Sequence, residues 1–527
     1  MAKGIKHASV GTILSQAEWE ADASHALDSG TGFPGSPTEG DLFYRTDEHL
    51  WYIYDGSAWT IVNASPVKGA SYVIFIDGST IKAVNGTTGI VDHLGTDAAT
   101  VIQAAIDAAS GAVLLRAGTY NIPDYTILYA RNGSMLVGEG ANTIIKRTGT
   151  PSADNFLIYV VGTAETPLYN VTISDLTLEG NEQSSVHGIR TSYCERSLFT
   201  RLRIQNMGIE GGADEGIVMH IGSHRNIVSH NFFYRCGAAG VEICQGPADY
   251  NRVLGNTFVE TPRYASEQAI NLWAGGGEFD PVRHNIVANN LILNPGSRGI
   301  TINKADYNLI ANNKVINPVY AASFIDVSAA YYNQILGNTL VGGAASTTHG
   351  IEILPDGTAL NLLIQGNTIQ GFTTTQKFGI YNRAKGVLIT ANYFIDNYRS
   401  ISEDAAATSQ SFIQGNWFGN TLKNIGSISI VKNNFGYVTE NNVLSNTFAI
   451  DSTGVKTVTI AHGCAYTPVT NDCAISVVEN TAVDDWRYDL LKVVSVDATN
   501  VTVKINVCQS SATGSATAKI ALRVGKP

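Results

Sequence analysis

The chain has 527 residues, of which 15% are charged, and a formal net charge of −11 at pH 7. A single hydrophobic core stops growing at about 250 to 300 residues, so this length requires several domains or a repeating architecture. The negative charge and the lack of a basic stripe argue against a general nucleic-acid binder, and an acidic partner would need a local cationic patch.

The sequence also argues against membrane insertion and against a disulfide or zinc scaffold. No uninterrupted apolar run is long enough to span a bilayer, and the polar start Met1–His7 does not resemble a secretory leader. The six cysteines are too scattered for a disulfide framework, and none has zinc-ligand spacing. Cys236 and Cys244 are interpreted as small buried thiols.

Residues 1–66 are expected to form a separate module. A capping box at Ser15 to Glu18 predicts a short helix, and the alternating aromatic segment 40–59 predicts small β-hairpins. This stretch resembles the short modules near the N-termini of phage tail-fibre and tailspike proteins, which implies virion attachment. Its aromatic residues offer either a sugar-stacking surface or a minimal hydrophobic core, and we favour the core: Trp51, Tyr52, Tyr54 and Trp59.

A capped amphipathic helix is predicted at 96–110, before Gly111, and a strand follows over 112–120. We expect this helix to close one end of a repeating structure, because terminal repeats need a cap.

Asparagines recur every 23 to 34 residues through the middle of the chain: Asn231, Asn256, Asn290, Asn313, Asn338, Asn367, Asn392 and Asn416. A second column precedes five of them at Asn226, Asn251, Asn285, Asn308 and Asn333. Self-similarity at this period predicts a solenoid of stacked coils. We interpret the asparagines as ladders that hold turns, because stacked amides bond one another and the backbone.

Three segments together carry a family resemblance: the helix pattern 97–106, Gly118-Thr119-Tyr120, and 171–181. They resemble the pectate-lyase-like right-handed parallel β-helix superfamily, to which phage tailspikes of the polysaccharide depolymerase type belong. The expected fold is therefore all-β, with a right-handed parallel β-helix solenoid over residues 67–446 between two smaller modules.

The last segment, residues 447–527, contains strand-like runs separated by turn residues, and it predicts a small antiparallel β-sandwich. It resembles the C-terminal modules of phage tail proteins, which implies trimerisation or contact with a receptor or carbohydrate.

One strand of each coil begins with a Gly-Ile-like pair, and the residue after the Ile is expected to point outward. This register places Asp326 and Glu352 on neighbouring coils about 4.8 Å apart, which suits the two acids of a retaining glycosidase. The register is doubtful at Asn382 and Glu403, because it would place both polar side chains inside the coil.

A second constellation of equal rank surrounds Glu242. His220 lies one coil before it, and Asn271 and Trp273 lie one coil after it, while Glu215 and Glu267 occupy the preceding loops. Trp273 offers a flat face to a sugar, and Glu242 with Glu215 or Glu267 would form the wider acid pair of an inverting enzyme. Further expected substrate-binding residues are Arg298, Asn303 and Lys304.

By resemblance, the chain is expected to be a homotrimeric phage tailspike that hydrolyses glycosidic bonds of a surface polysaccharide, located in the virion tail or baseplate or outside the cell. One alternative is a polysaccharide lyase or uronan C5-epimerase acting on an acidic polymer such as alginate or pectin. His220 matches one position of the mannuronan epimerase signature, whose aspartates are missing here. Another alternative is a non-catalytic glycan-binding fibre. No cofactor is expected, and a structural or substrate-bridging Ca²⁺ is the one ion left open.

Overall fold

The computed structural model describes residues 28–525 with internal gaps. The predicted helix at Ser15 to Glu18 lies outside the described residues. The gaps are 40, 47–49, 55, 62–68, 124–126, 150–154, 209–213, 264–266, 276–281, 318–324, 329, 344–348, 355–358, 404–410, 419–428, 433, 435–439, 445–447, 451–453, 462–472, 481–486, 498–499 and 510–515.

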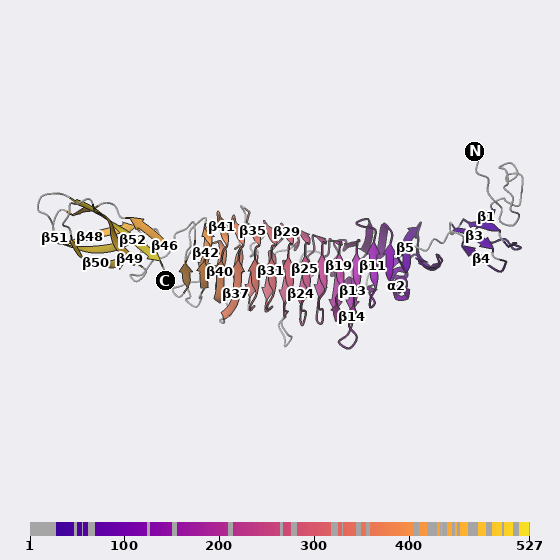
Figure 1. Ribbon diagram of the computed structural model, residues 1–527. Coiled ribbons are helices and arrows are strands. Elements are labelled where there is room, and N and C mark those ends of the chain that lie inside the picture. Colours follow the sequence, from indigo (N-terminus) through magenta and orange to yellow (C-terminus); the bar gives the residue numbers. More distant parts are fainter. Residues whose placement is uncertain are drawn as a thin grey trace, which may run out of the picture.

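Three sheets of short strands wind around one long core and form the solenoid in the middle of the molecule (Figure 1). The sheet that carries the candidate site, here called sheet A, contains β10 (Leu128–Tyr129), β13 (Asn155–Val161), β17 (Val186–Ser192), β21 (Ile217–Met219), β24 (Val241–Cys244), β27 (Gln268–Trp273), β30 (Arg298–Asn303), β33 (Ile325–Ser328), β36 (Ile351–Ile353), β39 (Phe378–Asn382) and β42 (Arg399–Glu403).

Sheet B begins with an antiparallel meander and continues as parallel strands. Its strands are β7 (Val91–Gly95), β6 (Thr80–Asn85), β5 (Tyr72–Asp77), β8 (Ala112–Leu115), β11 (Met135–Gly138), β15 (Thr172–Ser174), β19 (Leu198–Thr200), β22 (Ile227–Ser229), β25 (Arg252–Leu254), β28 (Ile286–Ala288), β31 (Leu309–Ala311), β34 (Gln334–Leu336), β37 (Ala359–Gln365), β40 (Lys385–Thr390), β43 (Ser411–Gln414) and β45 (Ile430–Lys432).

Sheet C is parallel throughout its described strands. They are β9 (Gly118–Ile122), β12 (Thr143–Arg147), β16 (Thr177–Glu179), β20 (Arg203–Gln205), β23 (Phe232–Tyr234), β26 (Thr257–Val259), β29 (Leu291–Leu293), β32 (Lys314–Ile316), β35 (Thr339–Val341), β38 (Thr368–Gln370), β41 (Tyr393–Ile395) and β44 (Trp417–Phe418). Two further short strands, β14 (Leu168–Tyr169) and β18 (Cys194–Glu195), pair with each other.

The core of the solenoid is a continuous stack of apolar side chains, one layer per coil. Ile217, Ile243 and Leu272 of sheet A are completely buried, and Phe233 of sheet C stacks on Phe258 of the next coil with ring centroids 4.6 Å apart. Burying a side chain of this size contributes about 1.5–3 kcal/mol, and the alternation of inward and outward residues repeats this gain in every coil.

Both asparagine columns are ladders inside the turns, as predicted. The Nδ2 of Asn256 donates to Oδ1 of Asn290 at 3.0 Å and to the carbonyl of Val228 at 2.9 Å. Its Oδ1 accepts the backbone N–H of Asn231 at 3.0 Å. Each buried amide is thereby satisfied by the coils on either side, so the ladders serve the fold.

The predicted cap is present as α2 (Ala98–Ala108) at the N-terminal end of the solenoid (Figure 1). The Asp97 side chain accepts the N–H groups of Ala99 and Thr100, which are otherwise unsatisfied in the first turn. Ile102 and Ile106 are buried against the first coils. The helix therefore covers apolar surface that a terminal coil would leave exposed.

The N-terminal strands β1 (Asp28–Gly30), β2 (Leu42–Arg45), β3 (Leu50–Tyr54) and β4 (Trp59–Ile61) form a small sheet with two antiparallel hairpins. Phe33 stacks on Trp59 at 5.1 Å and meets Tyr52 edge-on at 4.8 Å. Tyr52 is 8% exposed. These contacts favour the core interpretation for Tyr52 and Trp59, while virion attachment stays a prediction.

The C-terminal strands form two antiparallel sheets at the opposite end of the solenoid (Figure 1). One contains β46 (Glu440–Leu444), β47 (Phe448–Ile450), β49 (Cys473–Asn480) and β52 (Ala516–Gly525), and the other contains β48 (Gly454–Ala461), β50 (Arg487–Val496) and β51 (Asn500–Gln509). This pairing is consistent with the predicted sandwich. In the described part of the chain, no helix has the length and apolar character needed to cross a membrane.

The doubt about the register at Asn382 and Glu403 is wrong. Asn382 pairs in register with Ile353 and with Glu403, and both polar residues are almost completely buried inside the last coils. Asn382 Nδ2 donates to Ser411 Oγ at 2.8 Å, and Ser429 Oγ donates to Glu403 Oε2 at 2.7 Å. The solenoid accepts polar residues here because they satisfy one another.

Candidate functional site

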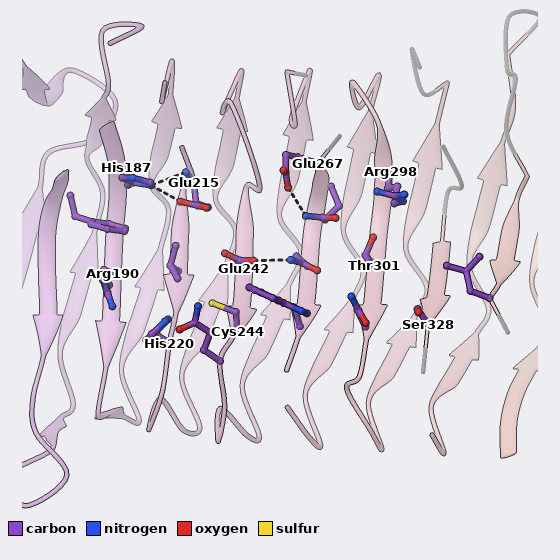
Figure 2. A pocket seen from close by; sticks show the side chains of 18 residues that line it. His187, Arg190, Glu215, His220, Glu242, Cys244, Glu267, Arg298, Thr301 and Ser328 are labelled. Atoms are coloured by element: carbon purple, nitrogen blue, oxygen red, sulfur yellow. Dashed lines mark hydrogen bonds and ion pairs between the residues drawn. The ribbon is translucent and has the colours of Figure 1, made fainter. Parts of the chain in front are cut away.

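A groove of about 590 Å³ crosses the outer face of sheet A, from β13 to the residue that follows β36. Figure 2 shows its three carboxylates, Glu215, Glu242 and Glu267, on successive coils. The complete lining is Phe156, His187, Arg190, Glu215, Val218, His220, Glu242, Cys244, Gln245, Glu267, Gln268, Asn271, Trp273, Arg298, Thr301, Asn303, Ser328 and Leu354.

Strand register explains why these side chains meet. The outward residue after each Ile pairs with the same position on the next coil, in the order Arg190, Val218, Glu242, Asn271 and Thr301. Neighbouring strands lie about 4.8 Å apart, so this row places five different side chains along the solenoid axis at that interval.

The floor of the groove is apolar although it faces outward. Phe156, Val218 and Cys244 form a buried cluster, and Tyr159 and Trp273 pack against it with part of their surfaces exposed. An outward apolar cluster in a hollow, with the flat face of a tryptophan beside it, suits a ligand with an apolar face and polar edges.

Glu242 is half-buried in the centre of the groove, where Asn271 Nδ2 donates to its Oε1 at 2.7 Å. Its pKa is raised from 4.5 to about 7, chiefly because burial disfavours the charged form and next because Glu215 lies nearby. Glu267 adds to the rise, and the hydrogen bond from Asn271 opposes it. A carboxyl with this pKa is available as a proton donor near neutral pH.

Glu215 lies at the edge of the groove and is held by a buried histidine. His187 Nδ1 lies 2.5 Å from Glu215 Oε2, and the backbone N–H of Glu215 points to the same nitrogen at 3.1 Å. Phe156 stacks on the imidazole ring at 4.3 Å and fixes its plane. The orientation of the Glu215 carboxylate is therefore set by two packed rings.

Glu267 and Arg298 lie on the same edge, one and two coils beyond Glu242. Gln268 Nε2 donates to Glu267 Oε2 at 3.0 Å, and the backbone N–H of Arg298 donates to the Glu267 carbonyl at 3.1 Å. Arg298 pairs in register with Gln268 and places a cation at this end of the groove.

His220 forms the opposite edge, near Arg190. Burial lowers the pKa of His220, the positive charge of Arg190 lowers it further, and a hydrogen bond with Gln245 opposes both effects. The imidazole is therefore neutral over a wider pH range than an exposed histidine. A neutral histidine beside an arginine can accept a proton.

Comparisons with known proteins agree with this architecture. A family described as "Right handed beta helix region" matches residues 67–281 in sequence. The match agrees with the three sheets of the solenoid, which give the chain a parallel β-helix fold. No curated protein matches it in sequence.

Among solved structures, this β-helix protein is similar to the tailspike protein of E. coli bacteriophage HK620 in complex with a pentasaccharide. The two are 15% identical over 84% of this chain and 92% of that chain, with a TM-score of 0.54. It is also similar to the A-module of the Azotobacter vinelandii mannuronan C-5 epimerase AlgE6, at 19% identity over 59% and 93% of the two chains and a TM-score of 0.46. The tailspike likeness shows a shared fold.

Most of the residues predicted from sequence line this one groove of the β-helix. They are Glu215, His220, Glu242, Glu267, Asn271, Trp273, Arg298 and Asn303. Lys304 is exposed beyond the end of β30, in a left-handed backbone conformation, and does not line the groove.

The predicted Asp326 and Glu352 pair lies beyond the groove. The two residues are partners in register on β33 and β36, as the repeat predicts. The side chain of Asp326 is outside the described part of the structure. Glu352 is half-buried. Burial lowers the pKa of His349, and the negative charge of Glu352 partly opposes this lowering.

Sequence reasoning did not include the row that contains His187. This residue directly precedes Gly188, as Glu215 precedes Gly216 and Arg298 precedes Gly299. The signal was therefore present as one fixed offset from the Gly-Ile pair. Among the described residues, no three His, Cys, Asp or Glu side chains gather closely enough to hold a metal ion.

Proposed function

We propose that this β-helix protein is a tailspike-type depolymerase that hydrolyses glycosidic bonds of a surface polysaccharide in the groove of sheet A. The observation that carries the proposal is Glu242, a carboxyl with a pKa of about 7 beside the oriented Glu215, above a floor that contains Trp273. Glycoside hydrolysis needs a protonated acid and an ionised carboxylate in one cleft.

Glu242 acts as the general acid in this mechanism. Its proton passes to the glycosidic oxygen as the bond from that oxygen to the anomeric carbon breaks. The hydrogen bond from Asn271 to Oε1 orients the Glu242 carboxyl before the substrate arrives. The like charges nearby keep the proton on Glu242 until a better acceptor arrives.

Glu215 acts as the general base. It takes a proton from a water molecule whose oxygen forms the new bond to the anomeric carbon. The backbones of Glu215 and Glu242 are one coil apart, about 4.8 Å along the solenoid axis. Glu215 lies three residues before Val218, the register partner of Glu242, which adds about 10 Å along the strand direction. This offset leaves room for the water molecule and favours an inverting reaction. Glu267 is the second candidate for the base.

The shared fold supports the proposal, because the HK620 tailspike was solved with a bound pentasaccharide. By the same likeness, we infer a place in a virion tail and a homotrimeric assembly. Light scattering on the full chain tests the assembly, and a monomer would contradict it.

One observation favours a lyase or epimerase instead. His220 has a lowered pKa and lies near Arg190, which gives a proton acceptor beside a cation that could neutralise a sugar carboxylate. Such a reaction would remove the C5 proton of a uronate and would not add water.

A panel of neutral and acidic polysaccharides incubated with the full chain distinguishes these reactions. Hydrolysis shortens a polymer and creates reducing ends without ultraviolet absorbance. A lyase shortens it with the absorbance of an unsaturated uronate, and an epimerase exchanges the C5 proton with solvent. Binding without any of these changes would contradict an enzymatic function and leave the fibre alternative.

A further inference from the structure

A second set of aromatic and cationic side chains lies on sheet A beyond the groove. Its members lie on β39 and β42 or close to the ends of β36, β39 and β42, and none of them lines the groove. We call this set the aromatic platform; its members are His349, Phe378, Tyr381, Arg383, Tyr398 and Arg399.

The rings of the platform are packed around Phe378. The imidazole of His349 lies 5.1 Å from the Phe378 ring at an interplanar angle of 21°, and the Tyr381 ring lies 5.3 Å from it. Tyr381 and Tyr398 are half-buried, so parts of both rings remain open to solvent. Packed rings of this kind hold their positions before a ligand arrives, which reduces the entropy cost of binding.

Two arginines lie over these rings. The guanidinium carbon of Arg399 is 4.8 Å from the centre of the Tyr398 ring and 5.7 Å from that of Phe378. The guanidinium carbon of Arg383 is 5.8 Å from the centre of the Tyr381 ring. Ring faces hold an arginine through cation–π attraction and fix the plane of its guanidinium group. Arg399 Nη2 also donates to the Tyr398 hydroxyl at 3.4 Å.

The platform is locally positive in a chain whose net charge is −11. Burial lowers the pKa of His349 to about 4, and the nearby charge of Lys377 also lowers it. His349 is therefore neutral near pH 7, and Lys377 adds a positive charge beside the platform. Arg399 forms no salt bridge with any residue that the structure describes. Glu403 is on the same strand but points inward and is 1% exposed. The charge of Glu352 also acts on His349 and partly offsets these cations.

The platform continues the rows of the groove. Glu352 and Tyr381 pair with each other and occupy the row of Glu242. Phe378 and Arg399 also pair, and they occupy the row of Glu215, directly before each Gly-Ile-like pair. Tyr381 is five strands from Glu242 along sheet A, which corresponds to about 24 Å. A glycan lying along the solenoid axis could therefore reach both places.

We propose that the aromatic platform is a second, non-catalytic binding site for a sugar residue that carries a carboxylate. The guanidinium fork of Arg399 matches a carboxylate, and the open parts of the Tyr381 and Tyr398 rings match the apolar face of a pyranose. The site binds acidic glycan whether or not the groove cleaves it. The platform thus supplies a local cationic patch of the kind that an acidic partner requires.

Titration calorimetry of the full chain with an oligogalacturonide tests the proposal. All variants carry Glu242→Gln, so that cleavage does not consume the ligand. Arg399→Gln should weaken binding about tenfold or more, because it removes a charged hydrogen-bond donor to the carboxylate. Tyr381→Ala should weaken binding about tenfold or more, because it removes the ring face that meets the pyranose and the ring under Arg383. Arg225→Gln is the matched control, since Arg225 lies 5.5 Å over the Tyr250 ring away from the platform. Its affinity should equal that of the parent.

Two further ligands separate charge from sugar recognition. A neutral dextran oligosaccharide and a poly-glutamate peptide of matched length should both bind at least tenfold more weakly than the oligogalacturonide. Binding that is unchanged in both platform variants would overturn the proposal, as would equal affinity for either control ligand. A change of oligomeric state in the platform variants would also overturn it, because the surface would then be an interface. None of these outcomes depends on cleavage in the groove.

Discussion

The asparagine ladders and the outer face of sheet A are built on the same repeat but follow opposite rules. In the ladders one residue type recurs in coil after coil, and each amide bonds its neighbours. On sheet A the residue changes at every coil, as in Arg190, Val218, Glu242 and Asn271. Recurrence in a solenoid marks what holds the coils together, and departure from recurrence marks where a ligand can be recognised.

On the outer face of sheet A, the largest expected effect is the loss of cleavage rate in Glu215→Gln. Loss of the general base should lower the rate of polysaccharide cleavage about 100- to 10,000-fold. The amide keeps the size of the side chain and can still bond His187, so the melting temperature should change little. Reducing-end formation and thermal unfolding measure the two quantities. Normal cleavage by Glu215→Gln would contradict the assignment of Glu215 as the general base and would leave Glu267 as the candidate.

The largest effect expected in the ladders is on stability. Asn290→Ala removes hydrogen bonds to Asn313 and Val253 and leaves buried partners unsatisfied, so the free energy of unfolding should fall by about 2–4 kcal/mol. Asn289→Gly is the control, because Asn289 is adjacent, exposed and in a left-handed conformation that glycine adopts freely. Denaturant unfolding should separate the two variants, and equal stabilities would contradict the ladder interpretation.

A smaller effect is expected from Trp273→Ala. Loss of ring stacking should raise KM about three- to tenfold with little change in kcat, because the ring binds ground state and transition state alike. Trp417→Ala is the control, since Trp417 is 48% exposed on sheet C. Steady-state kinetics on one oligosaccharide compare the two variants. Equal KM values would contradict a role of Trp273 in substrate binding.

A further expected effect is a pH dependence of stability. The folded-state pKa of Glu242 is raised from 4.5 to about 7, so its stabilising contribution is complete below about 4.5 and is lost as the pH rises through about 7. The melting temperature of Glu242→Gln minus that of the wild type should therefore be larger at pH 8 than at pH 5. A difference that is the same at both pH values would contradict the raised pKa. Cleavage by the wild type should also decline above pH of about 7.

The sequence predicted the solenoid because its period is carried by local, repeated chemistry: the Asn columns, the Gly-Ile pairs and the Asp97 cap. It placed Glu242, Asn271 and Trp273 on one face for the same reason. It could not choose between the Glu242 and Glu352 constellations, because the repeat does not specify where residues outside the strands, such as Glu215, lie relative to the row. His187 was missed because the position directly before each Gly-Ile pair was not followed as a row, although His187 shares that position with Glu215 and Arg298.

The two acids Glu242 and Glu352 allow the most direct test of the central claim. They occupy the same outward row and are both half-buried, but only Glu242 lies in the groove. Cleavage rates of Glu242→Gln and Glu352→Gln should be measured on the polysaccharide that the wild type shortens fastest. We expect the first variant to lose about 100-fold or more in rate and the second to stay within about twofold of the wild type. Normal cleavage by Glu242→Gln together with loss of cleavage in Glu352→Gln would contradict the assignment of the groove as the catalytic site.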